Sequence, residues 1–87
     1  MTNLEKYNKV FMDTFYIQKT QLNDDLTNEN IDEWDSIGQM TLITSLEEEF
    51  NIRLETEDIM SITSYKSGKE ILQKYNIKIW IIVKIIS

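Results

Sequence analysis

The segment Asp35–Phe50, DSIGQMTLITSLEEEF, decides the fold. Apolar residues recur at every third or fourth position along it, which is the spacing of one face of a helix about four turns long. Ser36 stands at the start of this pattern with Gln39 three residues later, an arrangement typical of a helix N-cap with a capping box. Asn51 is the expected stop. We therefore predict a helix from Ser36 to Phe50 with Ser36 as its cap.

Three more helices are expected on the same grounds. Apolar residues at spacings of three and four predict a first helix over about residues 3–17. After the central helix, a short extended link with Ile52 and Leu54 leads to a one- or two-turn helix capped by Thr56, and a fourth helix follows Thr63 or Ser64. The fold class is therefore all-α: a small four-helix bundle of three longer helices and one short helix, with a long loop between helices one and two.

The loop over residues 18–35 has no helical period and is rich in Asn, Asp and Thr. A loop of this length in a compact domain is usually functional or pinned by its apolar residues. The apolar residues available are Leu22, Leu26, Ile31 and Trp34.

The acids of this loop also invite comparison with a calcium-binding loop. Counted from Asp24, the EF-hand pattern is broken at Leu26, Glu29 and Asp35, so we predict no metal site of that kind. Loose divalent binding stays open for Asp24, Asp25, Asp32 and Asp35.

Residues 77–87, IKIWIIVKIIS, do not fit a helical bundle. Their β-branched residues at alternate positions have the period of a strand, yet no second strand is predicted to pair with them, and the segment is too short to span a bilayer as a helix. Three interpretations stay open: an extension of the last helix, an extended segment lying on the bundle or on a neighbouring chain, and an unstructured tail. We divide the chain into a domain over residues 1–76 and an apolar C-terminal extension over residues 77–87, and expect a monomer unless the extension mediates association.

The composition excludes most kinds of catalysis. The 87 residues make one small domain, without Cys or His, so thiol nucleophiles, imidazole bases and the usual zinc ligands are all missing. We predict that the protein is not an enzyme. The amino terminus has no continuous apolar run of the kind found in a secretory signal, and we expect a cytoplasmic location.

The negative charge is concentrated in the middle of the chain. Of the 15 acidic residues, most lie between Asn23 and Asp58, where Arg53 is the only basic residue, and the formal net charge is −6. Such a field repels nucleic acid and favours partners with basic patches. The plainer interpretation is a solvated face that keeps a small protein soluble.

The triplet Asp35-Ser36-Ile37 is followed at fixed spacings by the LEEEF run at 46–50 and by the segment around 59–64. This order of residues resembles the acyl carrier protein family, whose mark is an Asp-Ser-Leu triplet at the start of a helix that ends in Leu-Glu-Glu-Glu-Phe or a close variant. The resemblance covers about residues 3–75 and is strongest over 34–64. Ile37 replaces the usual Leu conservatively.

The resemblance implies a cofactor and a role. Ser36, between Asp35 and Ile37, would receive 4′-phosphopantetheine from coenzyme A through a separate phosphopantetheinyl transferase. The thiol of that arm would carry acyl or aminoacyl groups as thioesters between partner enzymes, in fatty acid biosynthesis or in specialised lipid or secondary-metabolite biosynthesis. A phosphodiester at this position also suits the free N–H groups and the dipole of a helix N-terminus.

The resemblance also implies surfaces for partners and for cargo. Acyl-activating or acyl-transferring enzymes with basic patches would recognise the second helix. The recognition residues would be Asp35, Ile37, Met40, Glu47 and Glu48, with Glu49 as a further candidate. In this family the core can part to shelter an acyl chain. The residues that would line such a pocket, and that are otherwise simply core, are Ile43, Leu46, Phe50, Leu54, Ile59, Ile62 and Leu72.

Two departures from the family pattern bear on the pathway. Gly38 and Thr41 stand where carriers of fatty acid synthesis usually have acids, and Trp34 before the triplet looks more like stand-alone carriers from specialised bacterial pathways. The alternative function is an unmodified acidic protein-interaction module that has kept the carrier fold.

Overall fold

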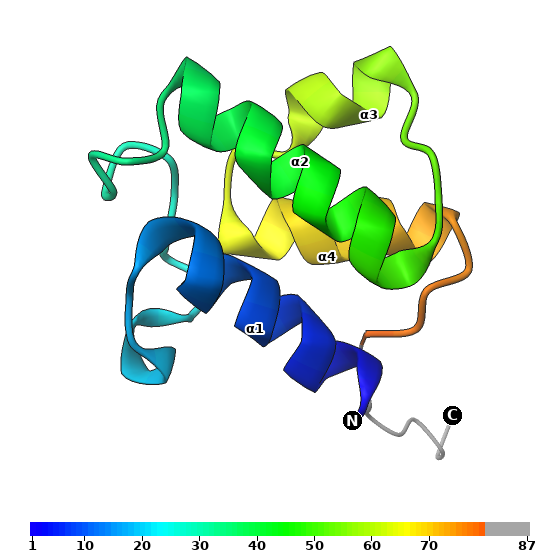
Figure 1. Cartoon of the computed structure of the whole chain (residues 1–87), viewed down its shortest axis with the longest axis horizontal. Helices are drawn as coiled ribbons and strands as arrows, with labels where there is room; N and C mark the ends of the chain where they lie inside the picture. The colour runs from blue at the N-terminus through cyan, green and yellow to red at the C-terminus, as the bar shows by residue number, and fades with distance from the viewer. Residues whose placement is uncertain (80–87) are drawn as a thin grey trace.

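The computed structural model describes residues 1–79 and is all-helical over that range. Its elements are α1 (Asn3–Phe15), a short 3₁₀ turn η1 (Lys19–Gln21), α2 (Ser36–Phe50), α3 (Thr56–Ser61) and α4 (Tyr65–Lys74). In Figure 1, α1 and α2 lie side by side, α4 passes behind α2, and α3 lies on the side of α2 opposite α1. The prediction of a small helical bundle with a long loop between its first two long helices is confirmed.

Three helix ends follow the sequence rules. The Thr2 side chain accepts a hydrogen bond from the Glu5 backbone N–H and the Glu5 side chain accepts one from the Thr2 N–H, so a capping box begins α1. Asn51 adopts a left-handed conformation with φ 54° and ends α2, as predicted. Ser64 caps α4 through the Ser67 N–H.

Two predicted caps are wrong. The N-cap of α2 is Asp35, whose Oδ1 accepts a hydrogen bond from the Gly38 N–H at 2.9 Å, and Ser36 is the first helical residue. Asp and Ser are equally good caps, and a carboxylate additionally suits the positive end of the helix dipole, so the earlier residue takes the position. The N-cap of α3 is Glu55, without a side-chain bond, and the expected cap Thr56 lies inside the helix.

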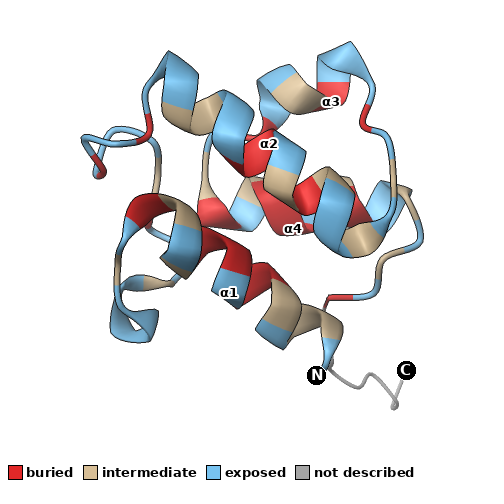
Figure 2. Ribbon diagram, in the orientation of Figure 1, coloured by how far each residue is buried: buried red, intermediate tan, exposed pale blue. Residues whose placement is uncertain are grey.

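The helices pack on an aromatic core. The Phe11 ring lies 4.9 Å from the Tyr7 ring and 5.4 Å from the Tyr65 ring, and the Phe15 ring is stacked on the Trp34 ring at 5.0 Å. The buried faces of α1, α2 and α4 meet there (Figure 2). Seven residues were predicted to be core or pocket lining. Two of them, Phe50 and Ile59, are half-buried against the core, and the five that are buried are Ile43, Leu46, Leu54, Ile62 and Leu72.

The long loop is pinned, as predicted, by apolar side chains. Leu26, Ile31 and Trp34 are buried, and Leu22 packs on the core. The loop backbone also pairs with the α3–α4 junction, because the Asn28 N–H donates to the Thr63 carbonyl at 2.9 Å and the Leu26 carbonyl accepts from the N–H that begins α4 at 3.0 Å. This pairing holds the residues before Ser36 in place.

The chain after α4 returns to the start of α1. The helix ends at Lys74, and Ile79 is only 1% exposed in the core, while the Asn3 side-chain amide donates to the Lys78 carbonyl at 3.2 Å. The three interpretations concern residues 77–87. Residues 77–79 are not helical, so an extension of the last helix is not seen over them, and residues 80–87 lie outside the described residues. Within residues 1–79, no helix has the length and apolar character needed to cross a membrane.

Candidate functional site

Ser36 lies at the first position of α2 with an exposed side chain. Because Asp35 supplies the cap, the Ser36 hydroxyl is not used in capping, and within residues 1–79 it has no hydrogen-bond partner. The backbone N–H groups of Ser36 and Ile37 are among those that an α-helix leaves without an intrahelical acceptor. The site therefore offers a free hydroxyl beside two N–H groups at the positive end of a helix.

Ser36 stands between two surface depressions. One, of about 460 Å³, runs along the outer face of α2 and is lined by Ser36, Ile37, Met40, Thr41, Thr44 and Ser45. The other, of about 400 Å³, lies among the long loop, α2 and the end of α3 and is lined by Asn28, Trp34, Asp35, Ser36, Gln39, Met60 and Thr63. A group attached to Ser36 thus has a recessed surface on either side.

Gln39 connects the elements that line the second depression through hydrogen bonds. Its side-chain Nε2 donates to the Ile59 carbonyl at 2.9 Å and to the Ile62 carbonyl at 3.1 Å, and its Oε1 accepts from the Trp34 indole N–H. The sequence pattern assigned Gln39 to a capping box with Ser36, and that assignment is wrong. Its role was missed because nothing local in the sequence shows that the carbonyls of α3 lie opposite it.

Close packing explains why a glycine occupies position 38 inside α2. A Cβ atom at this position would overlap the Glu33 carbonyl oxygen and lie 3.3 Å from Phe15 Cε1. Glycine therefore lets the loop before Ser36 cross α2 at close range, which outweighs the usual cost of glycine in a helix. The absence of an acid at Gly38 is thus explained by packing.

Exposed apolar side chains surround Ser36. Ile37 is 78% exposed and Met40 is 55% exposed on α2, and Met60 is 73% exposed on α3. Ile37 and Met40 were predicted as recognition residues, while Met60 was not, since its helix gave no sign of which face would be solvated. We call these three side chains the apolar collar of Ser36.

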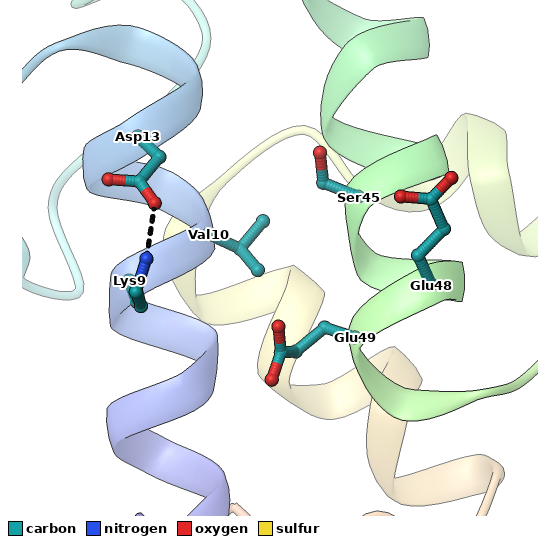
Figure 3. Close-up of a pocket in the computed structure, with 6 residues that line it drawn as sticks. All are labelled: Lys9, Val10, Asp13, Ser45, Glu48 and Glu49. Carbon is teal, nitrogen blue, oxygen red and sulfur yellow. Dashed lines mark hydrogen bonds and ion pairs between the residues drawn. The ribbon is translucent and has the colours of Figure 1, made fainter.

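The acids at the end of α2 differ in what they contact. Glu47 Oε2 accepts a hydrogen bond from the Leu54 N–H at 2.9 Å, so this carboxylate anchors the link to α3. Glu48 is exposed, and Glu49 extends toward α1, where a cleft contains the Lys9–Asp13 ion pair of 2.8 Å (Figure 3). Asp35 is exposed but already bonded as the cap. Within residues 1–79, Glu48 and Glu49 make no hydrogen bond or ion pair, whereas Asp35 and Glu47 each accept a hydrogen bond.

A second polar cluster lies on the far side of α3. Asp58 accepts from Lys74 Nζ at 2.6 Å and from the Tyr75 hydroxyl, and the same hydroxyl accepts from the Glu55 N–H at 2.9 Å. The bond from Lys74, and then that from Tyr75, lowers the pKa of Asp58, and the partnership raises the pKa of Lys74. This cluster fastens α3 to the end of α4 and is remote from Ser36.

The residues fit a phosphodiester-linked arm. The Ser36 hydroxyl is accessible, the two N–H groups suit a negative charge, and no acid other than the cap lines the depression beside Trp34. Among the described residues, no group of three or more acidic side chains converges as metal ligands.

The chain matches the family model described as phosphopantetheine attachment site over residues 18–67, more than half of its length. It belongs to this family, and the resemblance to acyl carrier proteins seen in the sequence is confirmed. The protein is a non-catalytic carrier of 4′-phosphopantetheine that works with a phosphopantetheinyl transferase and with biosynthetic enzymes. Among curated proteins, none matches the sequence closely enough to be called a relative.

Proposed function

We propose that Ser36 is the attachment residue and that the chain carries acyl or aminoacyl groups as thioesters on the arm. The observation that carries the proposal is the free, exposed Ser36 hydroxyl at the first position of α2, in the middle of the family match. Ser36 Oγ attacks the phosphorus that bears the pantetheine in coenzyme A, the bond from that phosphorus to 3′,5′-ADP breaks, and the hydroxyl proton passes to a base of the transferase. Asp35 keeps the helix N-terminus formed during this attack, and Ile37 flanks the hydroxyl.

We further propose that partner enzymes dock on the apolar collar. Ile37, Met40 and Met60 offer apolar contact around Ser36, and the exposed Glu48 offers a negative charge about three turns further along α2. Thr41, where carriers of fatty acid synthesis usually have an acid, is exposed and uncharged, and together with Trp34 before the triplet this supports a stand-alone carrier of a specialised pathway. The partners would have an apolar patch at the centre of the interface and basic residues toward one side.

The test of attachment is intact mass after incubation of the full chain with coenzyme A and a promiscuous phosphopantetheinyl transferase. We expect a gain of one phosphopantetheine unit in the native protein and none in Ser36→Ala. The matched control is Ser45→Ala, which removes another hydroxyl from the same helix and should gain the same mass. A gain that persists in Ser36→Ala, or no gain in the native chain, would sink the proposal.

We also propose that the carrier is a cytoplasmic monomer. The described core is closed by its own helices, and five large apolar side chains are exposed among residues 1–79: the three around Ser36, with Met1 and Tyr16. Light scattering coupled to size-exclusion chromatography measures the mass in solution, and a dimer would point to association through another surface.

A further inference from the structure

The hydrogen bonds of Gln39 go beyond what attachment at Ser36 requires. Its amide meets one partner that can only donate, the Trp34 indole, and two that can only accept, the Ile59 and Ile62 carbonyls. One orientation of the amide satisfies all three partners, and a flipped amide satisfies none. Gln39 is therefore a fixed bridge from the buried Trp34 to the end of α3.

The helix on the other side of this bridge depends on such contacts. α3 has six residues, which is too short for stability of its own, and its N-cap makes no side-chain bond. At its beginning, α3 is tied to α4 through Asp58. At its end, within residues 1–79, Gln39 supplies the side-chain hydrogen bonds that join it to α2.

Gln39 also stands between the surface at Ser36 and the core. Ser36 and Gln39 line the same depression of about 400 Å³. One turn further along α2 lies Ile43, which is buried, as is Ile62 at the end of α3. To pass from this depression to the core between α2 and α3, an apolar chain has to displace the end of α3 and break its bonds to Gln39.

We propose that Gln39 is a latch that keeps α3 closed on α2, so that this carrier holds its cargo outside the core. The cargo class that suits a closed carrier is a short or polar acyl group, because a long alkyl chain would remain in water. The statement about cargo rests on attachment at Ser36, whereas the latch itself does not. Gln39 is a positioning residue here, acting through Trp34 and the α3 carbonyls.

The latch is tested first on the unmodified full chain. In Gln39→Leu, we expect amide hydrogen exchange over residues 59–62 to rise about tenfold or more and exchange in α1 to stay unchanged, since α3 loses an anchor and α1 makes no bond to Gln39. The Trp34 indole N–H resonance should shift at the same time. Gln73→Leu, at an exposed position of α4, is the matched control and should leave both signals as they are.

A second variant keeps this test decisive if Gln39→Leu does not fold. Gln39→Glu retains the shape and the acceptor for Trp34, but it places an oxygen opposite the two α3 carbonyls, so the same rise in α3 exchange is expected. Exchange over residues 59–62 within about twofold of the native protein in both variants would overturn the latch.

The cargo class is tested on protein loaded with acetyl or octanoyl pantetheine, by the rate at which hydroxylamine cleaves the thioester. In the native protein, the two rates should agree within about twofold, because both thioesters stay in solvent, whereas in Gln39→Leu the octanoyl thioester should be cleaved at least about fivefold more slowly. Strong protection of the octanoyl group in the native protein would overturn the cargo assignment. Failure to load the native chain at all would refute attachment at Ser36 and the cargo assignment with it, while the exchange experiment alone would still decide the latch.

Discussion

At the scale of single residues, Gly38 shows how tertiary packing reverses a local preference. Helix propensity alone favours Ala over Gly inside a helix by about 1 kcal/mol. At Gly38, however, the position of a Cβ atom is already occupied by the Glu33 carbonyl oxygen, and backbone cannot move aside as a flexible side chain can. The loop that precedes Ser36 can therefore pack against α2 only because Gly38 has no side chain.

We expect Gly38→Ala to lower the free energy of unfolding by about 1–3 kcal/mol, the usual cost of overpacking, in spite of the gain in propensity. Urea denaturation followed by circular dichroism measures this change. Thr44→Ala is the control, because it changes an exposed site of the same helix and should be neutral or slightly stabilising. A Gly38→Ala protein about 1 kcal/mol more stable than the native chain would mean that propensity decides and that the loop yields.

At the scale of elements, the helices were predictable, whereas two of the caps and the contacts between elements were not. The apolar spacing of each long helix is a local signal, so both ends of α1 and α2 and the start of α4 were predicted within a few residues of their observed positions. Asp35 and Ser36 are adjacent and equally suited to capping, so the sequence could not choose between them. The hydrogen bonds of Gln39 and the exposure of Met60 depend on where α3 lies relative to α2. The local sequence pattern does not predict that position.

The acidic end of α2 gives an element-scale prediction. Three acids near a helix C-terminus oppose the dipole, yet Glu47 is bonded to the Leu54 N–H and Glu48 is not. We expect Glu47→Lys to lower the free energy of unfolding by about 1–3 kcal/mol, because it leaves a partly buried N–H without its acceptor. Glu48→Lys should change it by no more than about 0.5 kcal/mol.

The two variants should also differ in partner binding. Glu48→Lys should slow modification by the transferase and reduce the salt dependence of that rate, since an exposed charge acts through long-range attraction. Kinetics of modification at several ionic strengths, together with thermal melting, separate the two roles. Equal losses of stability in both variants would make Glu48 structural and remove it from the docking surface.

At the scale of the whole molecule, the two ends of the described chain close the bundle together. Ile79 is buried in the core, the Lys78 carbonyl is bonded to the Asn3 side chain, and Ile77 packs on the core from its edge. The division of the chain at residue 76, drawn from the change in sequence pattern, stays a prediction. The burial of Ile79 favours a boundary further along the chain, because a residue that fills the core belongs to the domain.

Truncating single side chains in this segment decides the boundary. Ile79→Ala should lower the free energy of unfolding by about 2–4 kcal/mol, since it removes a fully buried side chain and leaves a cavity, whereas Ile77→Ala, at a half-buried site, should cost clearly less. Urea denaturation of the full chain measures both values under the same conditions, so any effect of the remaining residues is common to the pair. If Ile79→Ala costs no more than Ile77→Ala, the domain ends before residue 77 as the sequence pattern indicated. If the ranking is as expected, the segment after α4 helps to close the core beside α1, and a chain cut at residue 76 should unfold at lower urea concentrations than the full chain.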